Sequence, residues 1–416
     1  MDLPINRNKP LTMHIDLNSC FATCTQQADH LLRGKPLGIA AYDSPNGCVV
    51  SPSIEAKRFG VKVGMTVREC KLLCPQMIVR TPDPALYRDV HLKFKKIFLD
   101  YSPIVTPKSV DEAVIDFTLS ENLHPDLIRV GREIKQRMRS EIGEWISCNV
   151  GIGTNRFLAK LASSLHKPDG LDLIDHMNLE YIYSTTKLTD LNGINTRFQA
   201  RLNSYGVFTP TDFLYADNDL LQKRVFKSVL GRQWYYKLRG YETDDIEFKT
   251  KSIGQMYSIK GGASTQPEIA RILMKLCEKT GRRLRHQNFS ASGVHVAIVY
   301  KDFTYWHKGM MRDSDLYTTY EIYKNALYVM NKQSEKKPIS KLAISVYGLK
   351  ENSLAQETLF DEDETKMRKA SKAMDEINDK YGEFMITPGI MMQMEDEVID
   401  RISFGGVKEI ENLYSS

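Results

Sequence analysis

Apolar and polar residues alternate near the start of the chain. Met13, Ile15 and Leu17 can face a core, which leaves Asp16 and its polar neighbours on the opposite side. Alternation with a period of two is typical of a β-strand with one buried face. The pattern therefore predicts a half-buried strand that carries the carboxylate of Asp16.

A second stretch, residues 104–117, is predicted to be a β-hairpin, with the acidic pair Asp111 and Glu112 at or near its bend. If the hairpin and the first strand are neighbours in one sheet, these carboxylates converge with that of Asp16. Such charges repel one another unless divalent cations lie between them. Oxygen-rich sites suit Mg²⁺, and paired metals in them catalyse in-line phosphoryl displacement. The plainer alternative, surface acids near strand ends, is weakened because the acidic pair interrupts an apolar run.

Helical spacing follows the hairpin. Apolar residues recur every three or four positions over 125–142, and an alternating strand at 146–152 leads into a further helix at 155–164. The order β-α-β-β-α-β is ferredoxin-like, so the fold class is predicted to be α+β.

Residues 188–207 match a helix-hairpin-helix, whose turn would present backbone N–H groups at a helix N-terminus, a site that binds anions. An ordinary glycine-containing helical hairpin is the alternative.

The chain has 416 residues, 42% of them hydrophobic, which predicts several domains rather than one core. No run of 18 apolar residues occurs, so no membrane span is expected. The first ten residues lack the apolar stretch of a signal peptide. The seven cysteines have no zinc-site spacing, and we interpret them as reduced thiols of a cytoplasmic protein.

Charge is distributed unevenly along the chain. Residues 248–350 contain 18 Lys and Arg against 7 Asp and Glu, a net charge of +11. Residues 351–416 contain 7 against 16, a net charge of −9. A basic module of this size is expected of a protein that binds a phosphate backbone, although a basic surface can also be merely solvated.

Several motifs resemble those of one family. They occupy residues 16–22 (DLNSCFA), 55–65 (EAKRFGVKVGM), 109–113 (SVDEA), 150–163 (VGIGTNRFLAKLAS), 167–170 (KPDG), 191–194 (LNGI) and 251–254 (KSIG). Their order and separations are similar to those of the Y-family DNA polymerases, the DinB/UmuC-type lesion-bypass enzymes. The resemblance covers residues 10–360.

The resemblance implies a multidomain, right-hand polymerase with a ferredoxin-like palm, small fingers, a helical thumb that contains the helix-hairpin-helix, and an α/β little finger. The implied boundaries are 1–24 and 84–175 for the palm, 25–83 for the fingers, 176–243 for the thumb, 244–250 for a linker, 251–355 for the little finger, and 356–416 for an acidic C-terminal tail. In this family, small fingers leave the nascent base pair open and tolerate distorted templates, so low fidelity is expected.

By the same resemblance, Asp16, Asp111 and Glu112 are catalytic and bind two Mg²⁺ ions, with the carbonyl of Leu17 as a further ligand. Phe21 stands at the steric-gate position, where an aromatic ring excludes a 2′-hydroxyl; a core phenylalanine at a helix start is the alternative. The implied nucleotide-binding residues are Ser19, Cys20, Phe21, Lys57, Arg58 and Lys167.

The chain departs from the family within this set. Many members have Tyr-Glu-Ala-Arg where this chain has Ile-Glu-Ala-Lys at 54–57. Lys57 supplies a point charge without the bidentate fork of arginine, so weaker phosphate binding, or sharing with Arg58, is expected. Ser19 and Cys20 occupy positions that are often aromatic in the family.

The remaining implied contacts are to DNA and to a partner protein. DNA contacts are expected from Gly193, Asn195, Arg197, Lys251, Ser252, Gly254, Arg282, Arg283 and Arg285. Gln356, Leu359 and Phe360 fit the Q-x-x-L-F pattern by which bacterial polymerases bind the sliding clamp. The expected partners are therefore primer–template DNA, deoxynucleoside triphosphates and the bacterial sliding clamp, and a monomer is expected.

The leading hypothesis is thus a template-directed polymerase that bypasses DNA damage. A non-catalytic scaffold of the same family is a second hypothesis, which the three retained carboxylates disfavour. A nucleotidyl cyclase or another nucleotidyl transferase is a third. The helix-hairpin-helix and the basic module favour a long nucleic-acid substrate over a cyclase.

Overall fold

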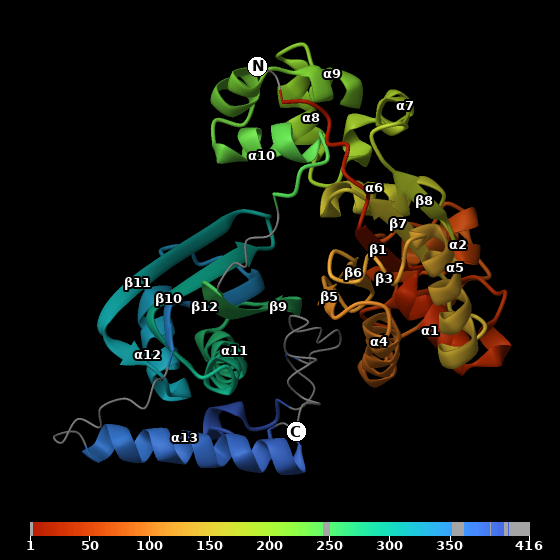
Figure 1. Cartoon of the computed structure of the whole chain (residues 1–416). Coiled ribbons are helices and arrows are strands. Elements are labelled where there is room, and N and C mark those ends of the chain that lie inside the picture. Colours follow the sequence, from red (N-terminus) through yellow and green to blue (C-terminus); the bar gives the residue numbers. More distant parts are fainter. Residues whose placement is uncertain (1–2, 244–249, 352–361, 383, 395–397, 399–416) are drawn as a thin grey trace. The chain divides into compact units, whose positions relative to one another are not determined.

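The computed structural model describes residues 3–243, 250–351, 362–382, 384–394 and 398 (Figure 1). The described residues divide into two compact units, which we call unit 1 (residues 3–243) and unit 2 (the described residues from 250 to 398). Both units combine helices with sheets, so the predicted α+β class is confirmed. In the described ranges, no helix is long and apolar enough to cross a membrane.

A five-stranded sheet in the order β5-β6-β1-β7-β8 forms the centre of unit 1. The strands are β1 (Thr12–Leu17), β5 (Ile104–Pro107), β6 (Glu112–Asp116), β7 (Cys148–Gly153) and β8 (Leu171–Ile174). β1 pairs antiparallel with β6 and β7, which confirms that the predicted strand and hairpin are neighbours. Strands β7-β1-β6-β5 have the ferredoxin-like order, and β8 adds a parallel edge strand that the sequence pattern did not predict.

Helices cover both faces of this sheet. α1 (Cys20–Ala28), α4 (Pro84–Leu99) and α5 (Leu127–Arg137) pack on one face, where the apolar side of β1 is buried among them. A π-helical turn (Met138–Ile142) extends α5. α6 (Arg156–Leu165) packs on the other face, where His14 Nδ1 lies 3.2 Å from the Ser163 hydroxyl. Since side chains alternate along a strand, Asp16 also belongs to the face that α6 covers.

Gly151 on β7 lets α6 lie directly on the sheet. A Cβ atom at this position would lie 2.1 Å from the backbone oxygen of Ala159 and 2.1 Å from the backbone nitrogen of Ser163. No side chain fits there unless the helix moves away, and α6 carries residues of the candidate site. The glycine therefore fixes the distance between the helix and the catalytic strands.

We expect Gly151→Ala to lower the free energy of unfolding by about 1–3 kcal/mol, the usual cost of overpacking a filled core. Urea unfolding followed by circular dichroism measures it. Gly389→Ala is the control, because an added Cβ there meets nothing within 4 Å. Equal stability of the two variants would contradict the close approach of α6.

Two smaller subdomains complete unit 1. The first contains a sheet of β2 (Leu37–Ala40), β3 (Val49–Pro52) and β4 (Ile78–Arg80) with helices α2 (Ile54–Arg58) and α3 (Val67–Leu73), which all lie within the predicted insert 25–83. A 3-10 turn (His30–Leu32) precedes this sheet.

The second subdomain is helical. It comprises α7 (Leu179–Thr185), α8 (Thr196–Asn203), α9 (Pro210–Tyr215) and α10 (Val229–Lys237), with a 3-10 turn (Leu188–Asp190) and a π-helical turn (Leu220–Val225). Leu3 and Ile5 pack against its core, and the Leu3 backbone N–H donates to the Tyr235 hydroxyl at 3.0 Å. The first residues of the chain thus pack with the predicted thumb, whereas the sequence had assigned them to the palm.

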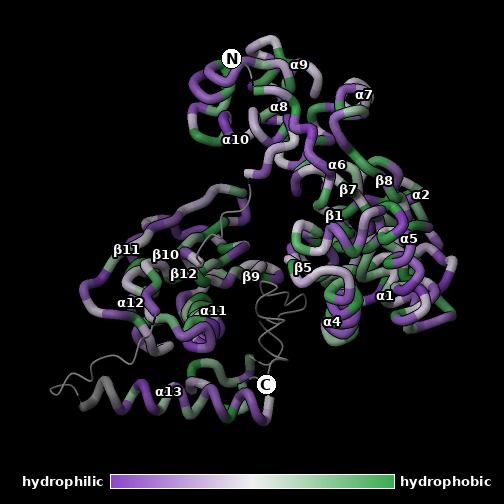
Figure 2. Tube along the Cα trace, in the orientation of Figure 1, coloured by the Kyte–Doolittle hydropathy of each residue, from purple (hydrophilic) through white to green (hydrophobic). Residues whose placement is uncertain are grey.

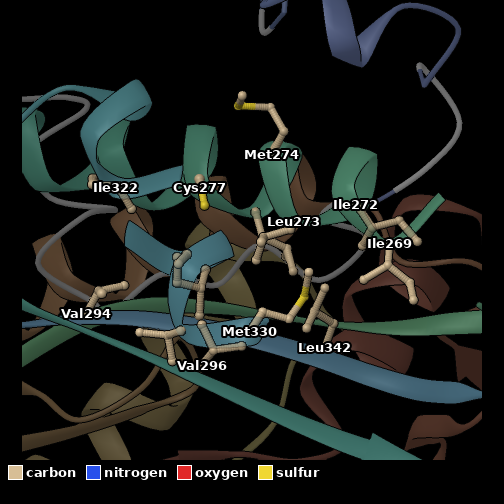
Figure 3. Close-up of a cluster of buried hydrophobic side chains, with 14 of the residues drawn as sticks. Ile269, Ile272, Leu273, Met274, Cys277, Val294, Val296, Ile322, Met330 and Leu342 are labelled. Atoms are coloured by element: carbon tan, nitrogen blue, oxygen red, sulfur yellow. The ribbon is translucent and has the colours of Figure 1, made fainter. Parts of the chain in front are cut away.

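Unit 2 is a four-stranded antiparallel sheet in the order β11-β10-β12-β9. The strands are β9 (Ser252–Ala263), β10 (Phe289–Tyr300), β11 (Tyr305–Leu316) and β12 (Ile339–Glu351). Helices α11 (Gln266–His286) and α12 (Thr319–Met330) pack on one face of the sheet over a buried apolar cluster (Figure 3). A third helix, α13 (Glu362–Tyr381), lies outside α11 and is followed by a 3-10 turn (Gly389–Met391) (Figure 1).

Candidate active site

The predicted acidic residues come together where β1, β6 and the start of α1 meet. In the register of β1 and β6, Asp16 lies opposite Glu112. The Leu17 backbone N–H donates to the Asp111 carbonyl at 3.0 Å. Asp111 precedes β6 in the hairpin bend, as the sequence predicted.

A cavity of about 200 Å³ opens beside these strands. Eight of the predicted residues line it: Asp16, Leu17, Ser19, Cys20, Phe21, Lys57, Asp111 and Lys167. Of the described residues, Glu112 and Arg58 do not line this cavity, although both were predicted to belong to the site. The cavity therefore joins carboxylates, lysines and one aromatic ring.

Lysines hold two of the three carboxylates. Lys167 forms an ion pair with Asp16, and Lys160 on α6 lies 2.7 Å from Glu112 Oε2. His14 Nε2 lies 3.7 Å from the same oxygen. His14 and Lys160 together lower the pKa of Glu112 to about 2, so this carboxylate is ionised at neutral pH.

The three predicted carboxylates lie near one another, and each has its own partner within the protein. The described residues contain no group of three His, Cys, Asp or Glu side chains close enough to hold a metal ion. The physical reason is charge, because Glu112 is directed to Lys160 on α6 while Asp16 pairs with Lys167. Each of these two carboxylates is thus paired with an ammonium group.

Asp111 has a different environment. Burial raises the pKa of its carboxyl group, and the negative charges of Asp16 and Glu112 raise this pKa further. A hydrogen bond that the Ser109 hydroxyl donates at 2.5 Å lowers the same pKa and so opposes the rise. A nearby cation would relieve this repulsion. Hard oxygen donors are the ligands that Mg²⁺ prefers, so Asp16, Asp111, Glu112 and the Leu17 carbonyl have the chemistry of a Mg²⁺ site.

Phe21 belongs to α1 and borders the cavity. Its ring stacks on that of Tyr87 from α4, with ring centroids 4.5 Å apart and an angle of 17° between the ring planes. The Tyr87 hydroxyl in turn lies 3.2 Å from the Thr25 hydroxyl. The aromatic ring at the cavity wall is therefore held by two helices.

Two lysines reach the cavity from different elements. Burial lowers the pKa of Lys57, and the nearby charge of Lys167 lowers it further. Lys167 begins a loop that Lys135 holds through an ion pair with Asp169 at 3.1 Å. The Gly170 backbone N–H donates to Asn149 Oδ1 at 3.1 Å. Two neighbouring cations form a site that favours a polyanion such as a triphosphate.

Sequence reasoning did not find Lys160 or Asn149. Lys160 interrupts a run of buried apolar residues on α6, and a charged residue in such a run is a signal for a charged partner. Asn149 lines the cavity and donates to Asn18 Oδ1 at 2.6 Å. No pattern in the sequence distinguishes Asn149 from its neighbours in β7.

The predicted DNA contacts of the helical subdomain lie at its surface. Gly193 has a φ of +103°, and Asn195 caps α8 by accepting a hydrogen bond from the Phe198 backbone N–H at 2.9 Å. Gly193, Asn195 and Arg197 are exposed. This geometry leaves the N-terminus of α8 accessible to an anion.

In unit 2 the predicted residues divide into two groups. Lys251 and Ser252 are exposed and Gly254 is half-buried at the start of β9, where the Arg283 guanidinium donates to the Gly254 carbonyl at 2.9 Å. Arg282 pairs with Asp379 of α13. Arg285 is 4% exposed and bound to Asp375 of α13, so the prediction that Arg285 contacts DNA does not hold in this structure.

The predicted clamp residues Gln356, Leu359 and Phe360 lie outside the described residues.

The sequence matches two models of the impB/mucB/samB family, the main one over residues 15–164 and the C-terminal domain over residues 250–359. A DNA polymerase IV of Moorella thermoacetica is 32% identical over 380 residues, 89% of this chain and 93% of the relative. A DNA polymerase IV of Staphylococcus aureus is 30% identical over 354 residues, 84% of this chain and 98% of the relative.

Solved structures have a similar fold. A Y-family DNA polymerase chimera of Dbh and Dpo4 superposes with a TM-score of 0.71 at 20% identity, over 82% of this chain and 99% of that protein. A Dbh ternary complex superposes with a TM-score of 0.57 over 81% of this chain and 98% of that protein. Together with the family models and the relatives, they show that this chain belongs to the Y-family DNA polymerases of the DinB/UmuC type.

Proposed function

We propose that this chain is a template-directed DNA polymerase that extends primers past damaged template bases. The observation that carries the proposal is the cavity in which two carboxylates, two lysines and an aromatic ring meet. Its carboxylates suit metal ions and its lysines suit a triphosphate. The relatives named DNA polymerase IV match over most of their length.

In this proposal Asp16, Asp111 and Glu112, with the Leu17 carbonyl, hold two Mg²⁺ ions. The ions, when bound, would lower the cost of ionising a primer 3′-hydroxyl and neutralise charge on the triphosphate. Lys160 stabilises ionised Glu112, and Ser109 orients Asp111. Lys57 and Lys167 bind the phosphates, and the Phe21 ring lies against the sugar. Ser19 and Cys20 complete the cavity wall.

The wider proposal includes low fidelity and the partners of the enzyme. The insert that borders the cavity has only a three-stranded sheet and two short helices, which supports an open site with few contacts to the nascent base pair. Primer–template DNA would contact the exposed N-terminus of α8 and the start of β9 through phosphates, without reading sequence. We propose that the enzyme acts as a monomer.

Extension of a labelled primer tests the proposal. With Mg²⁺ and all four deoxynucleoside triphosphates, the primer should be extended along the template. When only one deoxynucleoside triphosphate is supplied, it should be added only where the template base is its complement. Formation of a cyclic nucleotide, with no primer extension, would favour the cyclase alternative. Binding of DNA without any synthesis would favour the scaffold.

Lys57→Ala is expected to raise the KM for deoxynucleotides about tenfold, because one charge-assisted contact with the phosphates is lost. Steady-state single-nucleotide insertion measures it. Arg58→Ala is the matched control, because Arg58 is adjacent in sequence but does not line the cavity. A larger effect for Arg58→Ala would assign the phosphates to Arg58 instead.

Replacing Gln356, Leu359 and Phe360 with alanine is expected to abolish stimulation by the bacterial sliding clamp, because the apolar side chains would no longer fill its pocket. Synthesis without the clamp should stay unchanged. Primer extension with and without loaded clamp separates the two effects. Loss of both activities would indicate that this segment has a structural role.

A further inference from the structure

Asn149 is a buried amide in the strand beside Asp16. It lies on β7 directly opposite Asp16 of β1, and its exposed fraction is 1%. Hydrophobic residues make up much of β7 and β8 (Figure 2). Burying an amide in such surroundings costs free energy unless its hydrogen bonds are satisfied. The partners of Asn149 therefore indicate what this residue contributes.

Asn149 joins two segments of the candidate active site that are distant in sequence. Its Oδ1 accepts a hydrogen bond from the Gly170 backbone N–H at 3.1 Å. Its Nδ2 donates to Asn18 Oδ1 at 2.6 Å. Gly170 ends the loop of residues 167–170, which we call the lysine loop because it begins at Lys167, and Asn18 directly follows β1. One side chain thus connects the lysine loop with the strand that carries the first carboxylate.

The main chain fixes the orientation of both amides. The Gly170 N–H can only donate, so it selects the oxygen of Asn149 and turns Nδ2 toward Asn18. Asn18 in turn presents its oxygen to Asn149 and donates from Nδ2 to the Ser147 hydroxyl at 3.1 Å. The Asn18 backbone N–H also donates to the Ser147 carbonyl, at 2.9 Å. The contact between the two segments therefore needs a side chain that accepts at one end and donates at the other, which an amide does.

The end of the lysine loop is anchored through both of its backbone polar groups. Lys135 of α5 donates to the Gly170 carbonyl at 3.1 Å, and Asn149 binds the Gly170 N–H. Asn149 also lines the cavity that Lys167 borders. Lys167 forms an ion pair with Asp16. The anchored loop end limits how far the Lys167 ammonium group can move away from Asp16.

We propose that Asn149 is a positioning residue for nucleotide binding, which keeps the Lys167 ammonium group beside Asp16, where the phosphates of a deoxynucleotide bind. This inference rests on the proposed function, in which Lys167 binds the phosphates. Asn149 acts through the lysine loop and does not act on the reacting atoms. Replacing it should therefore weaken the binding of a deoxynucleotide and change the rate of the bound complex much less.

The test measures equilibrium binding of a deoxynucleoside triphosphate to the full chain with Mg²⁺ and primer–template DNA, whose primer ends in a dideoxynucleotide so that no reaction follows. Asn149→Val suits a strand and removes both hydrogen bonds. We expect it to weaken binding about tenfold, because the contact of Lys167 with the phosphates is lost. Asn178→Val is the matched control, because Asn178 also accepts one hydrogen bond and donates one but does not line the cavity. It should bind the triphosphate like wild type.

A double-mutant cycle separates a positioning role from a general loss of structure. If Asn149 acts through Lys167, Asn149→Val should weaken binding by less than about twofold when Lys167→Ala is already present. Hydrogen exchange gives a second measurement that needs no substrate. The Gly170 amide should exchange faster in Asn149→Val, while the Val150 amide, which donates to the Gly170 carbonyl at 3.0 Å, stays protected. Asn149→Thr, whose shorter side chain cannot bridge Gly170 and Asn18, serves in the same measurements if Asn149→Val does not fold.

Two results would overturn this inference and leave the proposed function standing. One is triphosphate binding by Asn149→Val equal to that of wild type, when Lys167→Ala alone weakens it. The other is an equal loss on replacing Asn149 with and without Lys167→Ala, which is the result of a purely structural role. If neither Lys57→Ala nor Lys167→Ala weakens triphosphate binding, the proposed phosphate site is wrong and the inference is overturned with it.

Discussion

The Asp111→Ala/Glu112→Ala protein is expected to lose primer extension by about a thousandfold or more and to bind primer–template DNA like wild type. Asp111 borders the cavity and Glu112 is held ionised by Lys160 and His14. Their removal takes away several kcal/mol of transition-state stabilisation. Single-turnover extension and a DNA-binding titration measure the two properties separately.

Two controls make this result specific. Asp116→Ala removes a carboxylate from the far end of β6, away from the cavity, and should leave extension close to wild type. Lys160→Met should impair extension less than the double variant, because it removes the partner of Glu112 and keeps both carboxylates. Substantial extension by the folded double variant would refute the assignment of these acids.

Phe21→Ala is expected to weaken discrimination against ribonucleotides on the order of a hundredfold, because a steric barrier in a pocket is removed. The ring is fixed by stacking on Tyr87 and borders the same cavity as Asp16 and Asp111. Removing it opens space where a 2′-hydroxyl would fit. The ratio of kcat/KM for a deoxynucleotide and the matching ribonucleotide measures the effect.

Phe21→Tyr is the matched control, since it keeps an aromatic ring against Tyr87. It should retain most of the discrimination. The alternative of a purely structural phenylalanine makes a different prediction, in which Phe21→Ala lowers stability and leaves the ratio unchanged. That unchanged ratio, in a folded protein, would refute the steric role.

Local patterns predicted the elements that hold the candidate site. Alternation placed Asp16 on the polar side of β1, and the acidic pair was placed at or near the bend; in the structure Asp111 lies in the bend and Glu112 is the first residue of β6. Both followed from periodicity, because a strand that buries one face leaves little freedom for its other residues. The motif resemblance then brought Lys57 and Lys167 to the same cavity before any geometry was known.

Contacts between distant residues could not be predicted in the same way. The pairs Lys160–Glu112 and Arg285–Asp375 join residues 48 and 90 positions apart, and nothing in the sequence around one partner specifies the other. The basic end of α11 was therefore assigned to DNA, whereas α13 covers much of it. The burial of Leu3 against the helical subdomain escaped prediction for the same reason.

Primer extension across a single abasic site tests the central claim most directly, with an undamaged template and the Asp111→Ala/Glu112→Ala protein run in parallel. We predict that wild type with Mg²⁺ inserts a nucleotide opposite the lesion and continues beyond it, and that the variant extends neither template. A folded, DNA-binding wild-type protein that copies the undamaged template but stops at the lesion, or that makes no DNA at all, would contradict the account.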